Sequence, residues 1–414
     1  MERFAGTSAA ESVVRAVRAG RDAFGASWAP DRVAIAPGRI ELLGNHVDYN
    51  GGPVLAAAID RFIVVAASDE PEQTPSLRVV AADVPEDGVA AIDAGTPRDW
   101  RNPSLPPRPF DYARGLLAGL QERPELTPRL PVSTAIAGDV PIGFGVSSSA
   151  ALCVSLALAL ADGFAGPEAI VLLAQEAEHR AGTPCGTMDQ SASVAGGVIA
   201  FDGATLAVER LSPSLGGLVF AVADSGVERS LGTSSYPRRV AESREALALA
   251  RRYLGEDVPQ LAALTFEQLN HLEQDGGLPD PLAQRTRHVI EETARVHEGR
   301  EAMAAGDWPR FGRLMTESGR SSATLYEISH PRVEELVAEA HGVAGVLGAR
   351  MMGGGEGGAV LILLSRDAVP ALESALLAGY YHRYGMAQRA GLIHVCAFAL
   401  GATVIAEDAL SGLV

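Results

Sequence analysis

The spacing of apolar positions predicts a chain in which helices alternate with short strands. Nine segments are predicted to be helices, of which the first is amphipathic: residues 1–20, 110–122, 150–161, 167–180, 238–254, 258–272, 281–305, 307–325 and 331–342. Short β-branched or alternating runs predict strands at residues 54–59, 62–67, 132–137, 198–201, 218–223 and 359–364. Residues 70–107, rich in proline and acidic side chains, predict surface strands and loops. Without any visible repeat, this mixture indicates an α+β fold.

The most apolar of the predicted helices directly follows a turn rich in glycine and serine. The segment reads GDVPIGFGVSSSAALCVSLALALA, residues 138–161, and its helix is expected to begin near Ser149. Gly143 and Gly145 allow the backbone to approach a ligand closely. The unpaired N–H groups and the dipole at a helix start attract anions, and the serine hydroxyls can hold phosphate oxygens or a cation. The turn therefore predicts a phosphate-bearing ligand, the alternative being a plain turn before a buried helix.

A second polar cluster precedes the strand at 54–59. Arg39, Glu41, Asn45, His46 and Asp48 lie within ten residues, in a stretch that we interpret as a loop. Polar groups on loops are a common way to build a binding site. The alternative is a solvated turn.

Further candidate groups lie behind the helix at 167–180. Glu178 is near the end of that helix, and Asp189 falls in a glycine- and serine-rich connection, where a carboxylate can face a cleft. Their ordinary roles would be an exposed helix charge and a helix cap. A second glycine-rich stretch, residues 348–364, leads into the predicted strand at 359–364.

Composition narrows the possible functions. At 414 residues the chain predicts two domains, for which we expect residues 1–204 and 205–414. A net charge of −17 argues against nucleic acid or an anionic membrane surface as a partner. The sequence contains no lysine, which excludes a P-loop lysine and a Schiff-base lysine. Three widely spaced cysteines and no apolar run of membrane length predict a cytoplasmic, reduced protein.

Three segments together resemble a known family. APGRIELLGNHVDYNGG, PIGFGVSSSAA and ARMMGGGEGG are similar, in order and spacing, to the signature motifs of the GHMP small-molecule kinases, and the first resembles that of galactokinases. The resemblance covers about residues 30–365. It implies an N-terminal domain like the second domain of ribosomal protein S5, a ferredoxin-like α+β C-terminal domain, and an active site between them.

The resemblance also implies a function and a set of site residues. It implies a sugar kinase that uses ATP and Mg²⁺ to phosphorylate an anomeric hydroxyl, with D-galactose the first candidate. The implied catalytic residues are Arg39 and Asp189. The implied sugar contacts are Asn45, His46, Asp48, Gly186 and Tyr236. ATP would lie on Gly143, Gly145, Ser147, Ser148, Ser149 and Ala150. Mg²⁺ would be held by Ser148 or Ser149 together with Glu178.

Some positions depart from the galactokinase pattern. Asn45 replaces a glutamate that contacts the sugar's 6-hydroxyl, and Glu41 replaces an asparagine; in the third motif, Met352 replaces a threonine and Glu356 a phenylalanine. The gap from Glu178 to Asp189 is one residue shorter than in galactokinases.

These departures leave the identity of the sugar open. We expect Asn45 to read position 6 and so to admit a 6-carboxylate, and Glu356 to turn away from the phosphates and meet Arg350. Galacturonate, L-arabinose and an N-acetylhexosamine stay open as substrates, as does a non-catalytic sugar sensor. The expected state is a monomer or weak homodimer.

Overall fold

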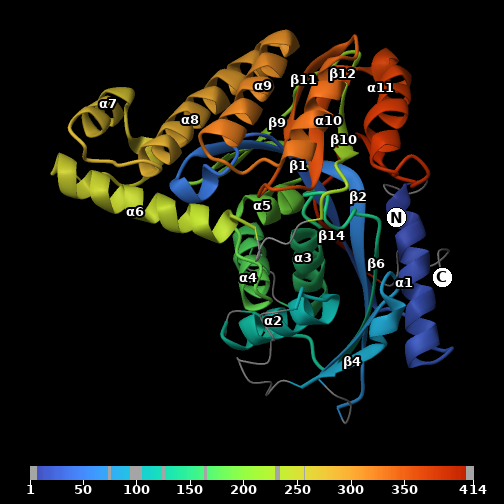
Figure 1. Cartoon of the computed structure of the whole chain (residues 1–414). Helices are drawn as coiled ribbons and strands as arrows, with labels where there is room; N and C mark the ends of the chain where they lie inside the picture. The colour runs from blue at the N-terminus through green and yellow to red at the C-terminus, as the bar shows by residue number, and fades with distance from the viewer. Residues whose placement is uncertain are drawn as a thin grey trace.

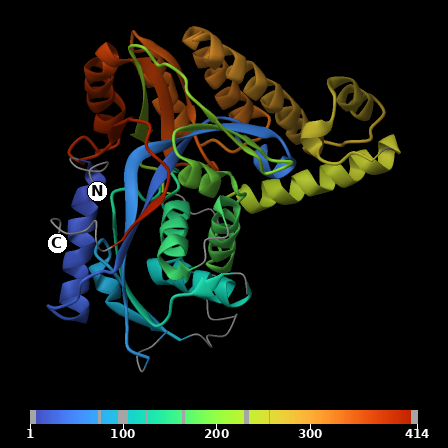
Figure 2. The same cartoon turned by 180° about the vertical axis from the view of Figure 1, so that it is seen from behind.

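The computed structural model describes residues 7–72, 76–93, 105–123, 126–162, 166–228, 234–255 and 257–406. Within these ranges the protein contains two main β-sheets with helices packed around them (Figures 1 and 2). This mixed architecture confirms the α+β prediction.

The larger sheet has eight strands in the described residues. Its main path runs in the order β14 (Thr403–Ala406), β1 (Arg32–Leu43), β2 (Pro53–Asp69), β6 (Val132–Gly138), β3 (Leu77–Ala81) and β4 (Val89–Ile92). Off this path, β8 (Val198–Asp202) pairs with β2, and β9 (Val208–Leu211) pairs with β8. These pairs are antiparallel except for β3 with β6.

Strand β1 corrects the prediction of a loop around Arg39 and Glu41. Both residues lie inside β1, and every residue of that strand is buried. The strand was missed because Arg39 and Glu41 are polar, yet both are buried and each has a polar partner, as described below. The runs predicted at 54–59 and 62–67 likewise form one strand, β2, which passes through Asp60 and Arg61 where its partner changes from β8 to β6.

Helices cover both faces of the larger sheet (Figure 1). α1 (Ser8–Phe24) packs on one face, where Val13 and Val17 contact the core formed with β1 and β2. The helices on the other face are α2 (Pro109–Gln121), α3 (Ser148–Leu160), α4 (Pro167–Arg180) and α5 (Met188–Ala195). The bounds of α4 match the prediction. A short pair, β5 (Thr127–Pro128) with β7 (Ala161–Asp162), follows at the far end of α3.

The smaller sheet is antiparallel and belongs to the second half of the chain. Its order is β11 (Val346–Met351), β12 (Ala359–Ser365), β10 (Leu218–Asp224) and β13 (Ile393–Cys396). The helices that pack with it and with one another are α8 (Leu282–Ala305), α9 (Trp308–Thr324), α10 (Pro331–His341) and α11 (Val369–Leu376).

Two further helices, α6 (Tyr236–Leu254) and α7 (Phe266–Gln274), extend to one side of the molecule (Figure 1). The helix predicted at 258–272 was wrong at its start, because Pro259 lies there and only a single 3₁₀ turn, Leu261–Ala263, follows it. α7 begins instead after Thr265, whose side chain caps the helix in a capping box with Gln268.

The two halves of the chain share structure. β9 and β14 belong to the larger sheet although both follow residue 204, and one apolar core contains Leu156 of α3 together with Leu363 of β12. The domain division at 204/205 stays a prediction. Residues from both halves therefore pack against one another. No helix in the described ranges combines the length and apolar character needed to cross a membrane.

Candidate active site

The glycine turn, residues 138–147, forms an open cradle at the start of α3. Gly143 and Gly145 have φ of +85° and +78°, which glycine adopts without strain. A Cβ added to Gly143 would meet no atom within 4 Å, so space lies beside the turn. Ser147 is the N-cap of α3 without capping it through its side chain, and the first N–H groups of the helix have no intrahelical partner. Backbone donors and the positive end of the helix dipole therefore meet at one place, as an anion site requires.

Arg39 and Asp189 meet beside this turn. The Arg39 Nε donates to Asp189 Oδ1 at 2.7 Å and its Nη2 donates to Oδ2 at 2.8 Å, while Nη1 donates to the Gly145 carbonyl at 2.5 Å. The Ser147 hydroxyl donates to Asp189 Oδ2 at 2.5 Å. Arg39 is buried, whereas the Asp189 side chain is 24% exposed, so a ligand can reach the carboxylate. Burial alone would lower the pKa of Arg39, but the Asp189 charge outweighs it and raises the pKa, which keeps the guanidinium cationic.

Glu178 lies close to the start of α3. Its carboxylate is buried and hydrogen-bonded to Ser149, and its Oε1 accepts from Gln190 Nε2 at 2.5 Å. Burial, reinforced by the Asp189 charge, raises the pKa of Glu178 to about 7. The Gln190 Oε1 atom is buried without a hydrogen-bond partner among the described residues. The group is thus rich in oxygen atoms and short of positive charge.

The loop at residues 44–50, which we call the 44–50 loop, brings His46 and Asp48 to the same region. Asp48 packs against Gly186, where an added Cβ would lie 2.0 Å from Asp48 Oδ2. The His46 ring lies 5.1 Å from the Tyr236 ring, between centroids. Burial, with a further contribution from the Asp189 and Glu41 charges, raises the pKa of Asp48 to about 7.

Of the predicted site residues, the structure thus gathers two groups. The first lies around the glycine turn and contains Arg39, Gly143, Gly145, Ser147, Ser148, Ser149, Ala150, Glu178 and Asp189. The second contains His46, Asp48, Gly186 and Tyr236. Asp189 acts electrostatically on Asp48, Glu178 and Tyr236, so the two groups form one polar site.

Comparison with known proteins places the chain in a family. Family models match the galactokinase galactose-binding signature at residues 21–69, the GHMP kinase N-terminal domain at 111–197 and the GHMP kinase C-terminal domain at 300–382. A galactokinase from Roseiflexus is 35% identical over 92% of this chain and 94% of its own length, and human galactokinase is 35% identical over 87% and 90%. The chain belongs to the galactokinase family.

Solved structures agree with this assignment. Galactokinase from Lactococcus lactis, solved with galactose, superposes with a TM-score of 0.82 at 27% identity, covering 94% of this chain and 98% of that one. A mevalonate kinase superposes with a TM-score of 0.60 at 16% identity, which shows the shared fold. The fold and family expected from the sequence are therefore confirmed.

Asn45 departs from the galactokinase pattern and does not join the groups described above. Its side chain is fully buried; Nδ2 donates to Glu41 Oε1 at 3.1 Å and to the Gly353 carbonyl at 2.9 Å, and Oδ1 accepts from the Ser322 hydroxyl at 3.0 Å. Both amide hydrogens are used within the protein, so none is left for a ligand. The structure therefore gives no support to Asn45 as a reader of sugar position 6.

Glu356 and Arg350 do not form the pair that the sequence predicts. Arg350 is fully buried and pairs with Glu41 at 2.8 Å, which joins β11 to β1. Glu356 is half-buried, has φ of 59° and donates its backbone N–H to the Ile328 carbonyl at 2.5 Å. The expected pairing was wrong because Glu41, distant in sequence, offers Arg350 a buried carboxylate.

Sequence reasoning also missed residues that support the 44–50 loop. Tyr49 lies between His46 and Tyr326: its hydroxyl is 2.8 Å from His46 Nδ1 and 3.0 Å from the Tyr326 hydroxyl. His288 and Glu292 of α8 contact the backbone of the same loop. The signal available in the sequence was the spacing of four residues between His288 and Glu292, which places them on one face of the predicted helix at 281–305.

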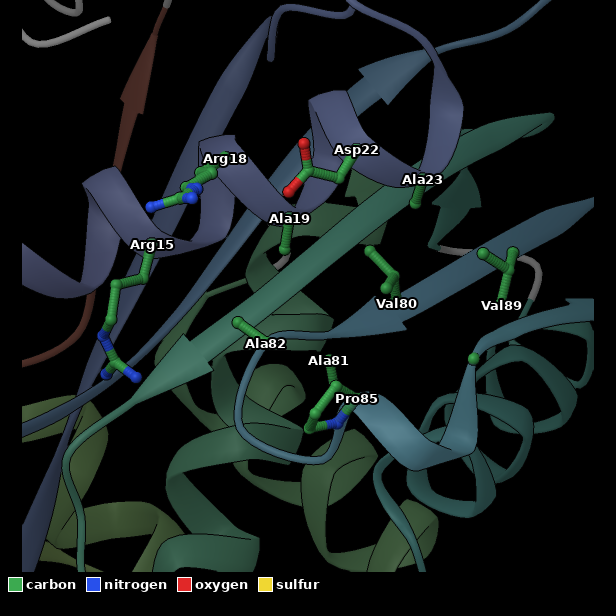
Figure 3. Close-up of a pocket in the computed structure, with 11 residues that line it drawn as sticks. Arg15, Arg18, Ala19, Asp22, Ala23, Val80, Ala81, Ala82, Pro85 and Val89 are labelled. Atoms are coloured by element: carbon green, nitrogen blue, oxygen red, sulfur yellow. The ribbon is translucent and has the colours of Figure 1, made fainter.

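A separate cavity of about 440 Å³ lies between α1 and strands β3 and β4 (Figure 3). Arg15, Arg18 and Asp22 of α1 and Val80 and Val89 of the strands line it. It contains none of the galactokinase-family site residues. Among the described residues, no cluster of three or more His, Cys, Asp or Glu side chains could hold a metal ion.

Proposed function

We propose that this protein transfers the γ-phosphoryl group of ATP to the anomeric hydroxyl of D-galactose. The observation that carries the proposal is the Arg39–Asp189 pair, held beside an open glycine turn and next to the polar 44–50 loop. The galactokinase relatives and the Lactococcus lactis structure with galactose support the choice of sugar.

Asp189 is suited to accept the proton of the attacking hydroxyl. It is partly exposed, and Arg39 and Ser147 fix both its oxygens, so the carboxylate is oriented before substrate arrives. Arg39 is cationic and buried, which allows it to stabilise negative charge that builds on the transferred group. Phosphoryl transfer needs positioning and charge stabilisation more than covalent chemistry, and this pair supplies both.

The ATP phosphates would lie on the glycine turn and the start of α3. The Ser149–Glu178 pair fits Mg²⁺, because it places a buried carboxylate and a hydroxyl oxygen in contact at the start of α3, and such oxygen atoms are the ligands that Mg²⁺ prefers. Gln190 Oε1, buried without a partner in the described residues, adds a further oxygen nearby. Mg²⁺ prefers few protein oxygens together with phosphates and water, and when bound it would neutralise charge on the transferring phosphoryl group. Ser148 stays the alternative serine ligand.

The sugar would lie against His46, Asp48, Gly186 and Tyr236. A side chain at position 186 would meet the Asp48 carboxylate, so glycine there lets Asp48 lie directly against the backbone beside the proposed sugar site. Asp48 is a strong acceptor for sugar hydroxyls when ionised. Buried polar groups of this kind discriminate against sugars that leave them unpaired.

The other sugars receive no support from the site. The case for galacturonate rested on Asn45 facing position 6 of the sugar. The side-chain amide of Asn45 instead donates to Glu41 and to the Gly353 carbonyl. A sensor without catalysis is disfavoured because Arg39 and Asp189 are both present and paired.

An ADP-release assay over a sugar panel tests the proposal. We expect the highest kcat/KM for D-galactose, against galacturonate, L-arabinose, N-acetylgalactosamine and glucose, at saturating ATP and Mg²⁺. Reactions without sugar measure background ATP hydrolysis. A preference for another sugar, or ADP release that does not depend on sugar, would contradict the proposal.

A further inference from the structure

The backbone of the 44–50 loop is held by two side chains from the other half of the chain. Glu292 Oε1 accepts from the backbone N–H groups of Gly44 at 2.9 Å and of Asn45 at 3.2 Å. His288 Nε2 lies 3.0 Å from the carbonyl oxygen of Asn45. The two side chains stand one helical turn apart on α8, so both face the loop. Both are fully buried, which removes competition from water.

The charge states of the two side chains suit these contacts. Burial would raise the pKa of Glu292, but the nearby positive charges, Arg295 first, and the Ser318 hydroxyl outweigh it and lower the pKa to about 2. Arg295 Nε donates to Glu292 Oε2 at 2.7 Å and the Ser318 hydroxyl donates to Oε1 at 2.6 Å. The carboxylate is thus anionic at neutral pH, and its bonds to the loop N–H groups are charge-assisted.

His288 is neutral and has a defined tautomer. Burial lowers the pKa of His288 to about 4. Because Nε2 faces the Asn45 carbonyl, the proton must sit on Nε2, and Nδ1 accepts from the Ser321 hydroxyl at 2.8 Å. The Glu292 carboxylate thus accepts from N–H groups of the loop, and the His288 Nε2–H donates to a loop carbonyl.

Glu292 and His288, which we together call the clamp, contact the backbone that immediately precedes His46. His46 has φ of 63°, a left-handed conformation that costs a non-glycine residue energy unless its surroundings enforce it. On the other side of His46, its Nδ1 meets the Tyr49 hydroxyl, which meets Tyr326. The backbone before His46 and the ring of His46 are thus both fixed from the C-terminal half.

We propose that Glu292 and His288 are positioning residues for the sugar: they hold the 44–50 loop so that His46 and Asp48 meet the substrate in the correct geometry. The inference rests on the proposed function. Neither residue is expected to touch the sugar, ATP or the reacting atoms. Their removal should therefore weaken sugar binding and leave ATP binding intact, because the glycine turn is held independently by β1 through the bond from the Arg39 backbone N–H to the Val146 carbonyl.

The test replaces Glu292 with glutamine, which keeps the size of the side chain and removes its charge. We expect the KM for galactose to rise ~10-fold, the order expected for weakened charge-assisted bonds, with kcat and the KM for ATP within about twofold of wild type. Glu298→Gln is the matched control, since Glu298 lies on the same helix and pairs with Arg310 but has no bond to the loop. Melting temperatures show whether each variant is folded.

Ser318→Ala is a milder variant in case Glu292→Gln does not fold, because it removes one bond to Glu292 and leaves its charge. We expect a smaller rise in the galactose KM, ~3-fold. A folded variant with an unchanged galactose KM, or with the two KM values rising together, would overturn the positioning role. The wild type is assayed first: if it prefers another sugar, the proposed substrate fails and the same comparison is made with that sugar.

Discussion

At the scale of single residues, Asp189 carries the chemistry of the proposed reaction. Asp189→Asn keeps the size of the side chain and much of its hydrogen bonding, but removes the base. We expect kcat to fall at least ~10²-fold, the lower end of what loss of a general base costs. ATP affinity, measured by calorimetry, should persist. Turnover close to that of wild type would remove Asp189 from this role.

A second prediction at this scale concerns the hydrogen bond between Asn45 and Glu41. Asn45→Glu would bring a carboxylate against Glu41 in a fully buried place, where Asn45 Nδ2 now donates at 3.1 Å. We expect the free energy of unfolding to fall by about 2 kcal/mol, because a donor is lost and like charges meet. Adding Glu41→Asn to the Asn45→Glu variant should restore about 1 kcal/mol or more of the lost free energy of unfolding, because it places an amide opposite the new carboxylate.

Urea denaturation of both single variants and the double variant measures this coupling. Arg350, which pairs with Glu41, is present in all of them. Strictly additive losses would mean that the two side chains do not act as a pair.

The protonation of Asp48 makes the stability of the folded protein depend on pH. Its pKa is raised to about 7 in the folded protein, chiefly by burial, against about 3.9 in an unfolded chain. The folded state therefore binds the proton more tightly, so the stabilising contribution of Asp48 is complete below the unfolded pKa and is lost as pH rises from about 4 through 7. Without ligands, Asp48→Asn should gain stability relative to wild type between about pH 5 and pH 8. A stability difference that stays constant over this range, in thermal unfolding, would contradict the assignment.

At the scale of elements, β1 contacts the glycine turn, which is the proposed ATP site. A Cβ added to Gly38 would lie 2.7 Å from the Val146 carbonyl oxygen, too close for any real contact. Gly38→Ala should therefore push the turn away from β1, and we expect the KM for ATP to rise ~10-fold, as for the loss of one or two hydrogen bonds.

Gly217→Ala is the control, because a Cβ at Gly217 meets no atom within 4 Å and its φ is not positive. It should leave both KM values unchanged. A Gly38→Ala enzyme with the ATP KM of wild type would show that the turn does not depend on this contact.

The same scale explains what the sequence could predict. Helix α4 was predicted with its observed bounds, because a 3.6-residue apolar pattern is a local property of the chain. The glycine turn and α3 were predicted from another local signal, a glycine- and serine-rich stretch followed directly by an apolar, alanine-rich one. β1 was missed around Arg39 and Glu41, because partners such as Asp189 and Arg350 let polar side chains lie inside a buried strand.

The contacts of the Asn45 side chain could not be predicted from the residues that lie next to it in the sequence. Its partners Ser322 and Gly353 lie 277 and 308 residues away in sequence. The resemblance to galactokinases predicts which motif holds the site, but it could not show where a substituted side chain in that motif would turn. Only tertiary structure decides that.

At the scale of the whole molecule, residues from both halves of the chain lie together at the proposed site. The first half supplies Arg39, the glycine turn and Asp189; the second supplies Tyr236 and the clamp of His288 and Glu292 on the 44–50 loop. The shared apolar core and the strands β9 and β14 join the halves. Catalysis should therefore depend on this packing as well as on the residues that touch substrate.

Phosphorus NMR of the product tests the central claim most directly. The protein is incubated with ATP, Mg²⁺ and D-galactose, with Asp189→Asn in parallel to exclude a contaminating kinase. The account predicts galactose 1-phosphate, formed in equal amount with ADP, and almost none from the variant. Phosphate on another hydroxyl, ADP without sugar phosphate, or equal product from Asp189→Asn would contradict it.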